Sequence, residues 1–115
     1  MTDKQIIGRM GEEAACEYLK SKGYRVVQTN FLCKTGEIDI ICLKDGCTVF
    51  VEVKTRKNSN FGAAAEFVDF RKQQKVKRAA MYYIKTADAD MRFDVVEVYH
   101  TNGKVAEINH IENAF

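Results

Sequence analysis

An Asp-Gly turn between two alternating apolar segments is the feature that most constrains the fold of this chain. Asp45-Gly46 separates residues 36–44 from residues 47–54, and this pattern is the strongest short-range indication of a β-hairpin. Symmetric closure about the turn would place Asp39 opposite Glu52. We therefore predict a hairpin that brings two carboxylates together on one face.

The predicted carboxylate pair is a candidate metal site. Directly opposed residues in an antiparallel pair have Cβ atoms ~4.5–5.5 Å apart, where two like charges are destabilising. Mg²⁺ would offset that repulsion, because it takes oxygen ligands and binds through one or two carboxylates together with substrate phosphates. The same register puts Glu37 opposite Lys54, and side-chain alternation puts Lys54 on the face of Glu52. An ammonium is therefore expected beside the pair.

These charged residues also fit a purely structural interpretation. Asp39 and Glu52 would be solvated edge residues if the register slipped by one, although the valine alternation of the second strand makes such a slip costly. Lys54 would equally serve as an ion-pair partner of Glu37 and nothing more.

The hairpin also has apolar surfaces that must be buried. The face away from the carboxylates carries Ile38, Ile40, Val49, Val51 and Val53. Near the turn, the charged face carries Ile41, Leu43, Thr48 and Phe50. We therefore expect a sheet that is covered on both sides.

Hydrophobic periodicity predicts the order helix, three strands, helix, two strands. The expected segments are a helix over 4–21, a strand over 24–29, a connection over 30–35, the hairpin, a loop over 55–64, a helix over 68–85, and strands over 92–99 and 104–110. Such an order predicts an α/β fold with a mixed sheet and a helix on each face. The length of 115 residues predicts a single domain covering 1–115.

Composition indicates a soluble folded protein, with 46% apolar and 30% charged residues. The longest apolar run is well short of the ~18 residues of a membrane span, and the first residues lack the pattern of a secretion signal, so we expect a cytoplasmic protein. The four cysteines have no CxxC spacing, which argues against zinc and favours free thiols.

Basic residues are clustered, although the net charge of +2 is too small to identify a nucleic-acid-binding protein. Five of the eight residues 71–78 are basic, and a second cluster follows the carboxylate strand at Lys54, Arg56 and Lys57. On the second helix, helical spacing aligns one stripe of Arg71, Lys75, Arg78, Tyr82 and Lys85. This stripe is either a phosphate-binding track or an ordinary solvated face. Lys72 and Gln73 instead align with the buried side and could point toward the charged end of the sheet.

Two further patterns refine the candidate site. On the first helix Glu12 borders the buried stripe, whereas Glu13 points away from it, so only Glu12 is placed to reach the sheet. His100 and His110 have no partner evident in the sequence. The chain has no phosphate-cradling glycine loop and no serine-hydrolase elbow.

An acidic residue on one strand, Glu-x-Lys on the next and a glutamate on the preceding helix together resemble the PD-(D/E)xK nuclease superfamily. More narrowly, the chain resembles the YraN family of predicted endonucleases, which is similar to archaeal Holliday junction resolvases. The residues that carry the resemblance are Gly11-Glu12, Ala15, Leu19, Asn30, Gly36-Glu37-Ile38-Asp39, Phe50-Val51-Glu52-Val53-Lys54-Thr55-Arg56, Phe61-Gly62, Lys72 and Arg92-Phe93-Asp94-Val95-Val96.

The resemblance implies a restriction-endonuclease-like αβββαβ core. It implies that Asp39 and Glu52 bind Mg²⁺ or Mn²⁺, with the Val53 carbonyl as a further ligand. Lys54 matches the catalytic lysine of the superfamily, and Glu12 matches its helix glutamate. Ile38 stands where many members have proline, a common departure that leaves the metal site intact.

From the residues and the resemblance together, we expect a metal-dependent endonuclease that hydrolyses DNA phosphodiester bonds in branched or flapped DNA. Phosphate contacts are expected from Arg56, Lys57, Arg71, Lys72, Lys75 and Arg78. Symmetric cutting of two strands by so small a domain would need a homodimer. The alternatives are a non-catalytic nucleic-acid-binding module, a domain that docks an acidic protein partner, and a nuclease acting on RNA.

Overall fold

The computed structural model describes residues 1–60, 69–85 and 90–115. In chain order the elements are α1 (Asp3–Ser21), β1 (Arg25–Cys33), β2 (Gly36–Lys44), β3 (Cys47–Lys57), the 3₁₀ helix η1 (Asn58–Asn60), α2 (Phe70–Ile84), β4 (Met91–Thr101) and β5 (Lys104–Ile111). This is the predicted order of helix, three strands, helix and two strands, with η1 added. Neither helix is long and apolar enough to cross a membrane, as far as the described ranges show.

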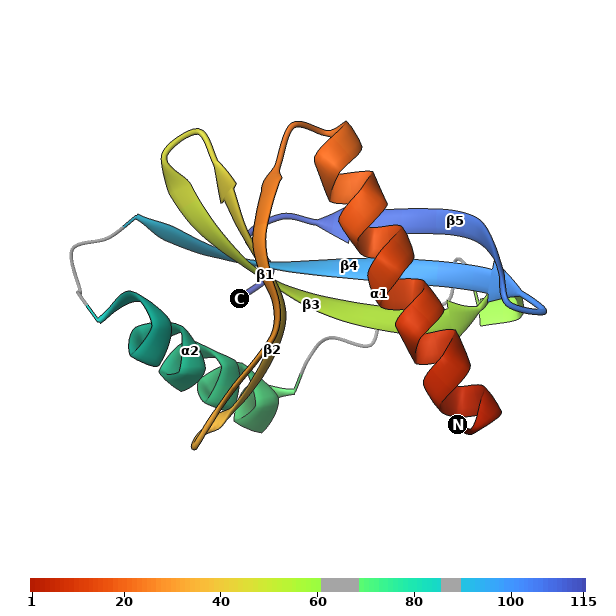
Figure 1. Cartoon of the computed structure of the whole chain (residues 1–115), viewed down its shortest axis with the longest axis horizontal. Helices are drawn as coiled ribbons and strands as arrows, with labels where there is room; N and C mark the ends of the chain where they lie inside the picture. Colours follow the sequence, from red (N-terminus) through yellow and green to blue (C-terminus); the bar gives the residue numbers. More distant parts are fainter. Residues whose placement is uncertain (61–68, 86–89) are drawn as a thin grey trace.

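The five strands form one mixed sheet in the order β1-β2-β3-β4-β5. Neighbouring strands are antiparallel except for β3 and β4, which are parallel. A parallel pair needs a long crossover connection, and α2 lies within this one. Figure 1 shows the twisted sheet with α1 and α2 on either side of it. The predicted α/β fold is confirmed, and it is consistent with a restriction-endonuclease-like core.

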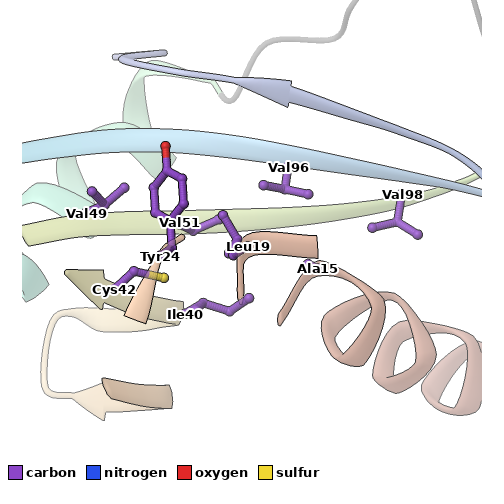
Figure 2. Packing of buried hydrophobic residues seen from close by; sticks show 9 residues of the cluster. All are labelled: Ala15, Leu19, Tyr24, Ile40, Cys42, Val49, Val51, Val96 and Val98. Carbon is purple, nitrogen blue, oxygen red and sulfur yellow. The ribbon is translucent and has the colours of Figure 1, made fainter. Parts of the chain in front are cut away.

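Each helix buries its apolar stripe against one face of the sheet. The cluster under α1 consists of Ala15, Leu19, Tyr24, Ile40, Cys42, Val49, Val51, Val96 and Val98 (Figure 2). The cluster under α2 consists of Ile38, Ile41, Phe50, Val76, Ala79, Ala80 and Phe93. Ile38 was predicted to share a face with Ile40 and instead packs on the α2 side. The pairing of β2 with β3 ends at Ile40. The arm formed by β1 and β2 runs toward α2 (Figure 1), which explains the change of face.

β1 and β3 extend into segments that the sequence predicted as a connection and a loop. β1 continues to Cys33, so most of the expected connection over 30–35 is strand. β3 continues to Lys57, and residues 61–64 of the expected loop over 55–64 lie outside the described residues. In both cases a neighbouring strand supplies partners for the backbone: Phe31 pairs with Ile38, and Lys57 with His100. Strand pairing satisfies backbone hydrogen bonds regardless of how polar the side chains are.

Both helices begin at capping side chains. The Thr2 hydroxyl accepts a hydrogen bond from the Gln5 amide at 3.2 Å, and the Gln5 side chain accepts one from the Thr2 amide at 3.0 Å. The Asp69 carboxylate accepts one from the Lys72 amide at 2.9 Å. Such caps satisfy amides that the first turn of a helix leaves unpaired. The Asp69 cap therefore fixes where α2 begins, and with it the position of Lys72 beside the sheet.

A close contact between Gly11 and Thr55 sets the distance between α1 and β3. A Cβ atom at Gly11 would overlap the Thr55 hydroxyl, whereas a Cβ at Gly8, one turn earlier, would have no atom within 4 Å. Gly11 is therefore required for close packing, and it fixes the neighbouring Glu12 over the sheet.

Gly11→Ala is expected to lower the free energy of unfolding by about 1–3 kcal/mol, because overpacking forces the helix away from the strand. Gly8→Ala is the matched control and should raise that free energy by about 1 kcal/mol, because alanine is the better helix former. Urea unfolding of the wild type and both variants measures these two changes in free energy. Equal effects of the two substitutions would show that the Thr55 contact does not set the helix position.

Candidate active site

The site lies where β2 and β3 separate. Their register runs from Lys44↔Cys47 to Ile40↔Val51, which confirms symmetric closure about the Asp-Gly turn. The β1–β2 arm turns toward α2, while β3 continues alongside α1 (Figure 1). The register ends one pair before Asp39 and Glu52, which corrects the prediction that they are ladder partners, and it does not extend to Glu37 and Lys54. A fork between the strands takes the place of those pairs.

Asp39 bridges the fork with its side chain. Its Oδ2 accepts a hydrogen bond from the backbone amide of Val53 at 2.9 Å. The amide and carbonyl of a strand residue point to the same side of the strand. The Val53 carbonyl is therefore directed toward the gap that β2 leaves, on the same side as the Asp39 carboxylate.

Glu52 supplies a second carboxylate, and only half of it is satisfied. Its side chain is 9% exposed, and its Oε1 lies 3.1 Å from the Lys72 ammonium of α2. Its Oε2 is buried and has no hydrogen-bond partner among the residues that the structure describes. A buried oxygen without a partner is destabilising, and the Glu52 side chain that carries it lines a pocket. Such an atom is suited to bind a ligand.

The electrostatics of the two carboxyl groups favour a cation between them. Burial, followed by the charge of Glu52, raises the pKa of Asp39 to about 7. Burial also raises the pKa of Glu52, and the Lys72 ammonium opposes that rise. Like charges in a shared, partly desolvated site cannot both ionise freely. Near neutral pH the pair therefore either retains a proton or binds a positive ion.

Glu12 approaches the site from α1, as its helical position predicted, whereas Glu13 is exposed. Burial, and then the charge of Asp39, raises the pKa of Glu12. With its amide oriented to satisfy both groups, Asn30 donates to Glu12 Oε1 at 3.3 Å and to Glu37 Oε1 at 3.0 Å. Asn30 has a φ of 51°, an uncommon conformation that asparagine tolerates. It is a site residue that the sequence patterns did not single out for any role.

A pocket of about 570 Å³ joins these groups, and its lining residues are Lys4, Ile7, Gly8, Glu12, Asp39, Glu52, Val53 and Thr55. Lys54, which follows Val53 on β3, is near enough for its charge to lower the pKa of Glu52. The structure therefore brings together Glu12, Asp39, Glu52, Val53, Lys54 and Lys72.

The donor atoms fit a hard divalent cation. Within the described part of the chain, no cluster of three or more His, Cys, Asp or Glu side chains is arranged to hold a metal. The available set is instead two carboxylates, one with an unpartnered buried oxygen, and the Val53 carbonyl. Mg²⁺ binds through few protein oxygens and keeps several of its waters. The residues present therefore fit Mg²⁺ or Mn²⁺ better than a metal that needs a complete protein cage.

The other predicted DNA-binding residues are dispersed. Arg56 is largely buried, with its Nε 3.5 Å from Glu97 Oε2. Lys57 is exposed beside the turn between β4 and β5. Arg71, Lys75 and Arg78 are exposed on α2. Among the α2 basic residues, Lys72 is thus the one whose ion pair reaches the carboxylates.

A sequence model of the uncharacterised protein family UPF0102 matches residues 11–98. The chain belongs to the UPF0102 family. A UPF0102 protein of Caldanaerobacter subterraneus subsp. tengcongensis is 47% identical, with 98% of this chain and 97% of the relative covered. A UPF0102 protein of Caldicellulosiruptor saccharolyticus is 45% identical, with 98% and 99% covered, and one of Pseudomonas syringae pv. syringae is 40% identical, with 97% and 94% covered. This membership confirms the resemblance to the YraN family.

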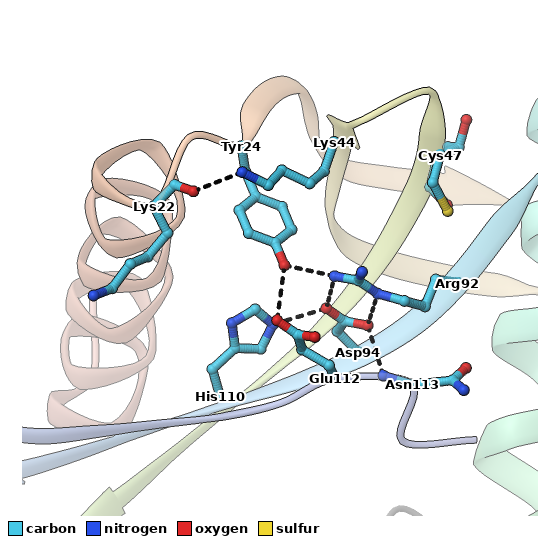
Figure 3. A network of polar contacts seen from close by, with 10 residues as sticks. Lys22, Tyr24, Lys44, Cys47, Arg92, Asp94, His110, Glu112 and Asn113 are labelled. Atoms are coloured by element: carbon cyan, nitrogen blue, oxygen red, sulfur yellow. Dashed lines mark hydrogen bonds and ion pairs between the residues drawn. The ribbon is translucent and has the colours of Figure 1, made fainter.

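The sequence patterns missed a polar network on the α1 face of the UPF0102 sheet, where Asp94 pairs with Val51 (Figure 3). Asp94 is fully buried and accepts hydrogen bonds from Arg92 Nε at 2.8 Å and from the Asn113 amide at 3.0 Å. His110 Nε2 lies 2.7 Å from Asp94 Oδ2. His110 therefore has a partner after all, and sequence periodicity carried no signal for it. Figure 3 shows Tyr24 joining the group from the segment after α1, through its hydroxyl and Arg92.

Proposed function

We propose that this UPF0102 protein is a metal-dependent endonuclease that hydrolyses DNA phosphodiester bonds, with a preference for branched or flapped DNA. The observation that carries the proposal is the unpartnered, buried Oε2 of Glu52 beside Asp39, whose pKa is raised to about 7. Perturbed titratable groups in a pocket are typical of catalytic sites. The proposal includes a cytoplasmic location and a homodimer for symmetric cutting.

A bound Mg²⁺ or Mn²⁺ would activate water and polarise the scissile phosphate. Asp39 and Glu52 would hold it, with the Val53 carbonyl as a further ligand. Lys54 would orient the attacking water and offset charge on the phosphate oxygens, as ammonium groups do in phosphoryl transfer. Glu12 would close the pocket on the α1 side. Lys72, now paired with Glu52, would exchange that carboxylate for a phosphate oxygen of the DNA.

The backbone of the DNA would be bound mainly by Arg71, Lys75 and Arg78 on α2, with Arg56 and Lys57 at the end of β3. Phosphate contacts of this kind give affinity that depends on salt and little on sequence. The contacts proposed here are all to phosphates, which carry no sequence information. Recognition of a DNA structure, in place of a base sequence, follows from this.

The test combines calorimetry with a cleavage assay. Mn²⁺ is titrated into the wild-type protein, Glu52→Gln and Lys54→Ala, with the exposed Glu13→Gln as the matched control. Linear, flapped, forked and four-way DNA, and the same shapes in RNA, are then offered in Mg²⁺ and Mn²⁺. We expect Glu52→Gln to lose both metal uptake and cleavage. Lys54→Ala should still bind Mn²⁺ and cleave roughly 100-fold more slowly. Absence of Mn²⁺ uptake with or without DNA would overturn the proposal.

The Lys72–Glu52 ion pair supports a second candidate function. In it the protein is a non-catalytic nucleic-acid-binding module, and the carboxylates only stabilise the fold. In that case Lys72 would be the permanent partner of Glu52. DNA binding without cleavage in Mn²⁺, unchanged by Asp39→Ala, would support the module.

A further inference from the structure

The outer surface of α2 has a second pocket, remote from the carboxylates. It is shallow, has a volume of about 470 Å³ and is lined by Thr35, Arg78, Met81, Tyr82 and Lys85. Thr35 comes from the turn between β1 and β2, and the other four come from the last turns of α2 and its C-terminal cap. The pocket is therefore built where the tip of the β1–β2 arm meets the end of α2.

The pocket combines an exposed apolar surface with positive charge. Tyr82 is 50% exposed and Met81 is 41% exposed. Two cationic side chains, Arg78 and Lys85, lie on either side of Tyr82 in the sequence, and both are exposed. Exposed apolar side chains that lie next to one another mark interaction sites more often than single, scattered ones do. The flanking charges favour an anionic partner.

We infer that this pocket binds an unpaired base of single-stranded nucleic acid, with Tyr82 as the stacking platform. Proteins that bind single strands combine a basic track for the backbone with aromatic side chains on which bases stack. Arg71, Lys75, Arg78 and Lys85 form such a track with Tyr82 within it. A base inside a duplex is stacked between its neighbours and cannot present its face to the ring.

The position of the pocket along α2 connects it with the proposed active site, and this part of the inference rests on the proposed function. Lys72, which contacts Glu52, precedes Tyr82 by ten residues, or roughly 15 Å of helix axis at ~1.5 Å per residue. At ~3.4 Å per nucleotide, the rise of a stacked strand, that is about four nucleotides, and fewer if the strand is extended. A flap bound along α2 would thus place its junction near the carboxylates and an unpaired base at Tyr82.

The test measures binding without metal, so it does not depend on cleavage. Fluorescence anisotropy in EDTA compares a labelled oligothymidylate single strand with a blunt duplex. Tyr82→Ala should weaken single-strand binding roughly tenfold, with duplex affinity unchanged. Tyr82→Phe keeps the ring and should stay within about twofold of wild type. Lys20→Ala removes an exposed charge from α1 and serves as the control. Because Tyr82 is half exposed, its replacement should not unfold the protein, which thermal unfolding checks.

A 2-aminopurine base in the single strand provides a direct signal for stacking. Its fluorescence should be quenched by wild type and Tyr82→Phe but not by Tyr82→Ala. Unchanged single-strand affinity in Tyr82→Ala, equal weakening for the duplex, or self-association through the pocket without single-strand binding would overturn the inference. Glu52→Gln should retain single-strand binding, so failure of the nuclease proposal is distinguishable from failure of this one.

Discussion

Asp39→Asn should make the metal-free protein more stable at about pH 8, by roughly 1–3 kcal/mol of unfolding free energy. The Asp39 carboxyl is partly buried beside Glu52, and its pKa is raised from 3.8 to about 7. Ionising it in the folded protein is therefore unfavourable. An asparagine side chain removes the charge while its carbonyl can still accept the Val53 amide. A destabilising group of this kind is typical of functional sites, where stability is lost for activity.

The stability gain should depend on pH in a defined direction. Below about pH 4 the carboxyl is protonated in both the folded and the unfolded chain, so the substitution changes little. As the pH rises to about 7 the unfolded chain ionises first, and the wild type loses stability relative to the variant. Above that pH the difference should stay constant. Urea unfolding at several pH values measures it, and Glu13→Gln, at an exposed carboxylate, is the control.

Mn²⁺ should reverse the stability order, so that the wild type becomes more stable than Asp39→Asn. A ligand that binds only the folded state adds about 2.7 kcal/mol at 100 times its dissociation constant. Wild type should gain this stabilisation, and Asp39→Asn should gain little of it. A variant that is less stable than wild type at about pH 8 without metal would show that the two carboxylates do not repel each other in the fork.

Asp94→Asn is expected to lower the free energy of unfolding by about 3 kcal/mol, because breaking a buried ion pair leaves its partners unmatched. Asp94 is fully buried and joins Arg92, His110 and the Asn113 backbone. The substitution should leave Mn²⁺ binding unchanged, since none of the residues bonded to Asp94 lines the pocket that holds Asp39 and Glu52. Asp90→Asn, at an exposed position just before β4, is the matched control.

The pH dependence of the Asp94 contribution runs opposite to that of Asp39. Burial alone would raise the pKa of Asp94, but hydrogen bonds from His110 and Arg92 lower it from 3.8 to about 2. A depressed pKa stabilises the folded state above the unfolded value, and that stabilisation is lost as the pH falls through the folded one. The gap between wild type and Asp94→Asn should therefore narrow between about pH 4 and about pH 2. If the difference in unfolding free energy did not vary over this pH interval, the lowered pKa of Asp94 would be contradicted.

Local pattern was sufficient for the elements whose signals lie within a few residues. The Asp45-Gly46 turn specified the hairpin and its register, because turn chemistry acts over neighbouring residues. Helical spacing likewise separated Glu12 from Glu13 and turned Lys72 toward the sheet. The turn and the two helical positions together identified most of the residues that meet in the candidate site.

Only the tertiary structure decided how those residues meet. The fork after Ile40 gives Asp39 the Val53 amide as a partner and moves Ile38 to the α2 face, since the bend of the β1–β2 arm depends on packing against α2. The bond between Asp94 and His110 spans 16 residues and forms through the pairing of β4 with β5. Sequence alone thus determined the elements and the kinds of charge they carry. Burial and long-range pairing, which arise when both faces of the sheet are covered, set the pKa values and partners of those charges.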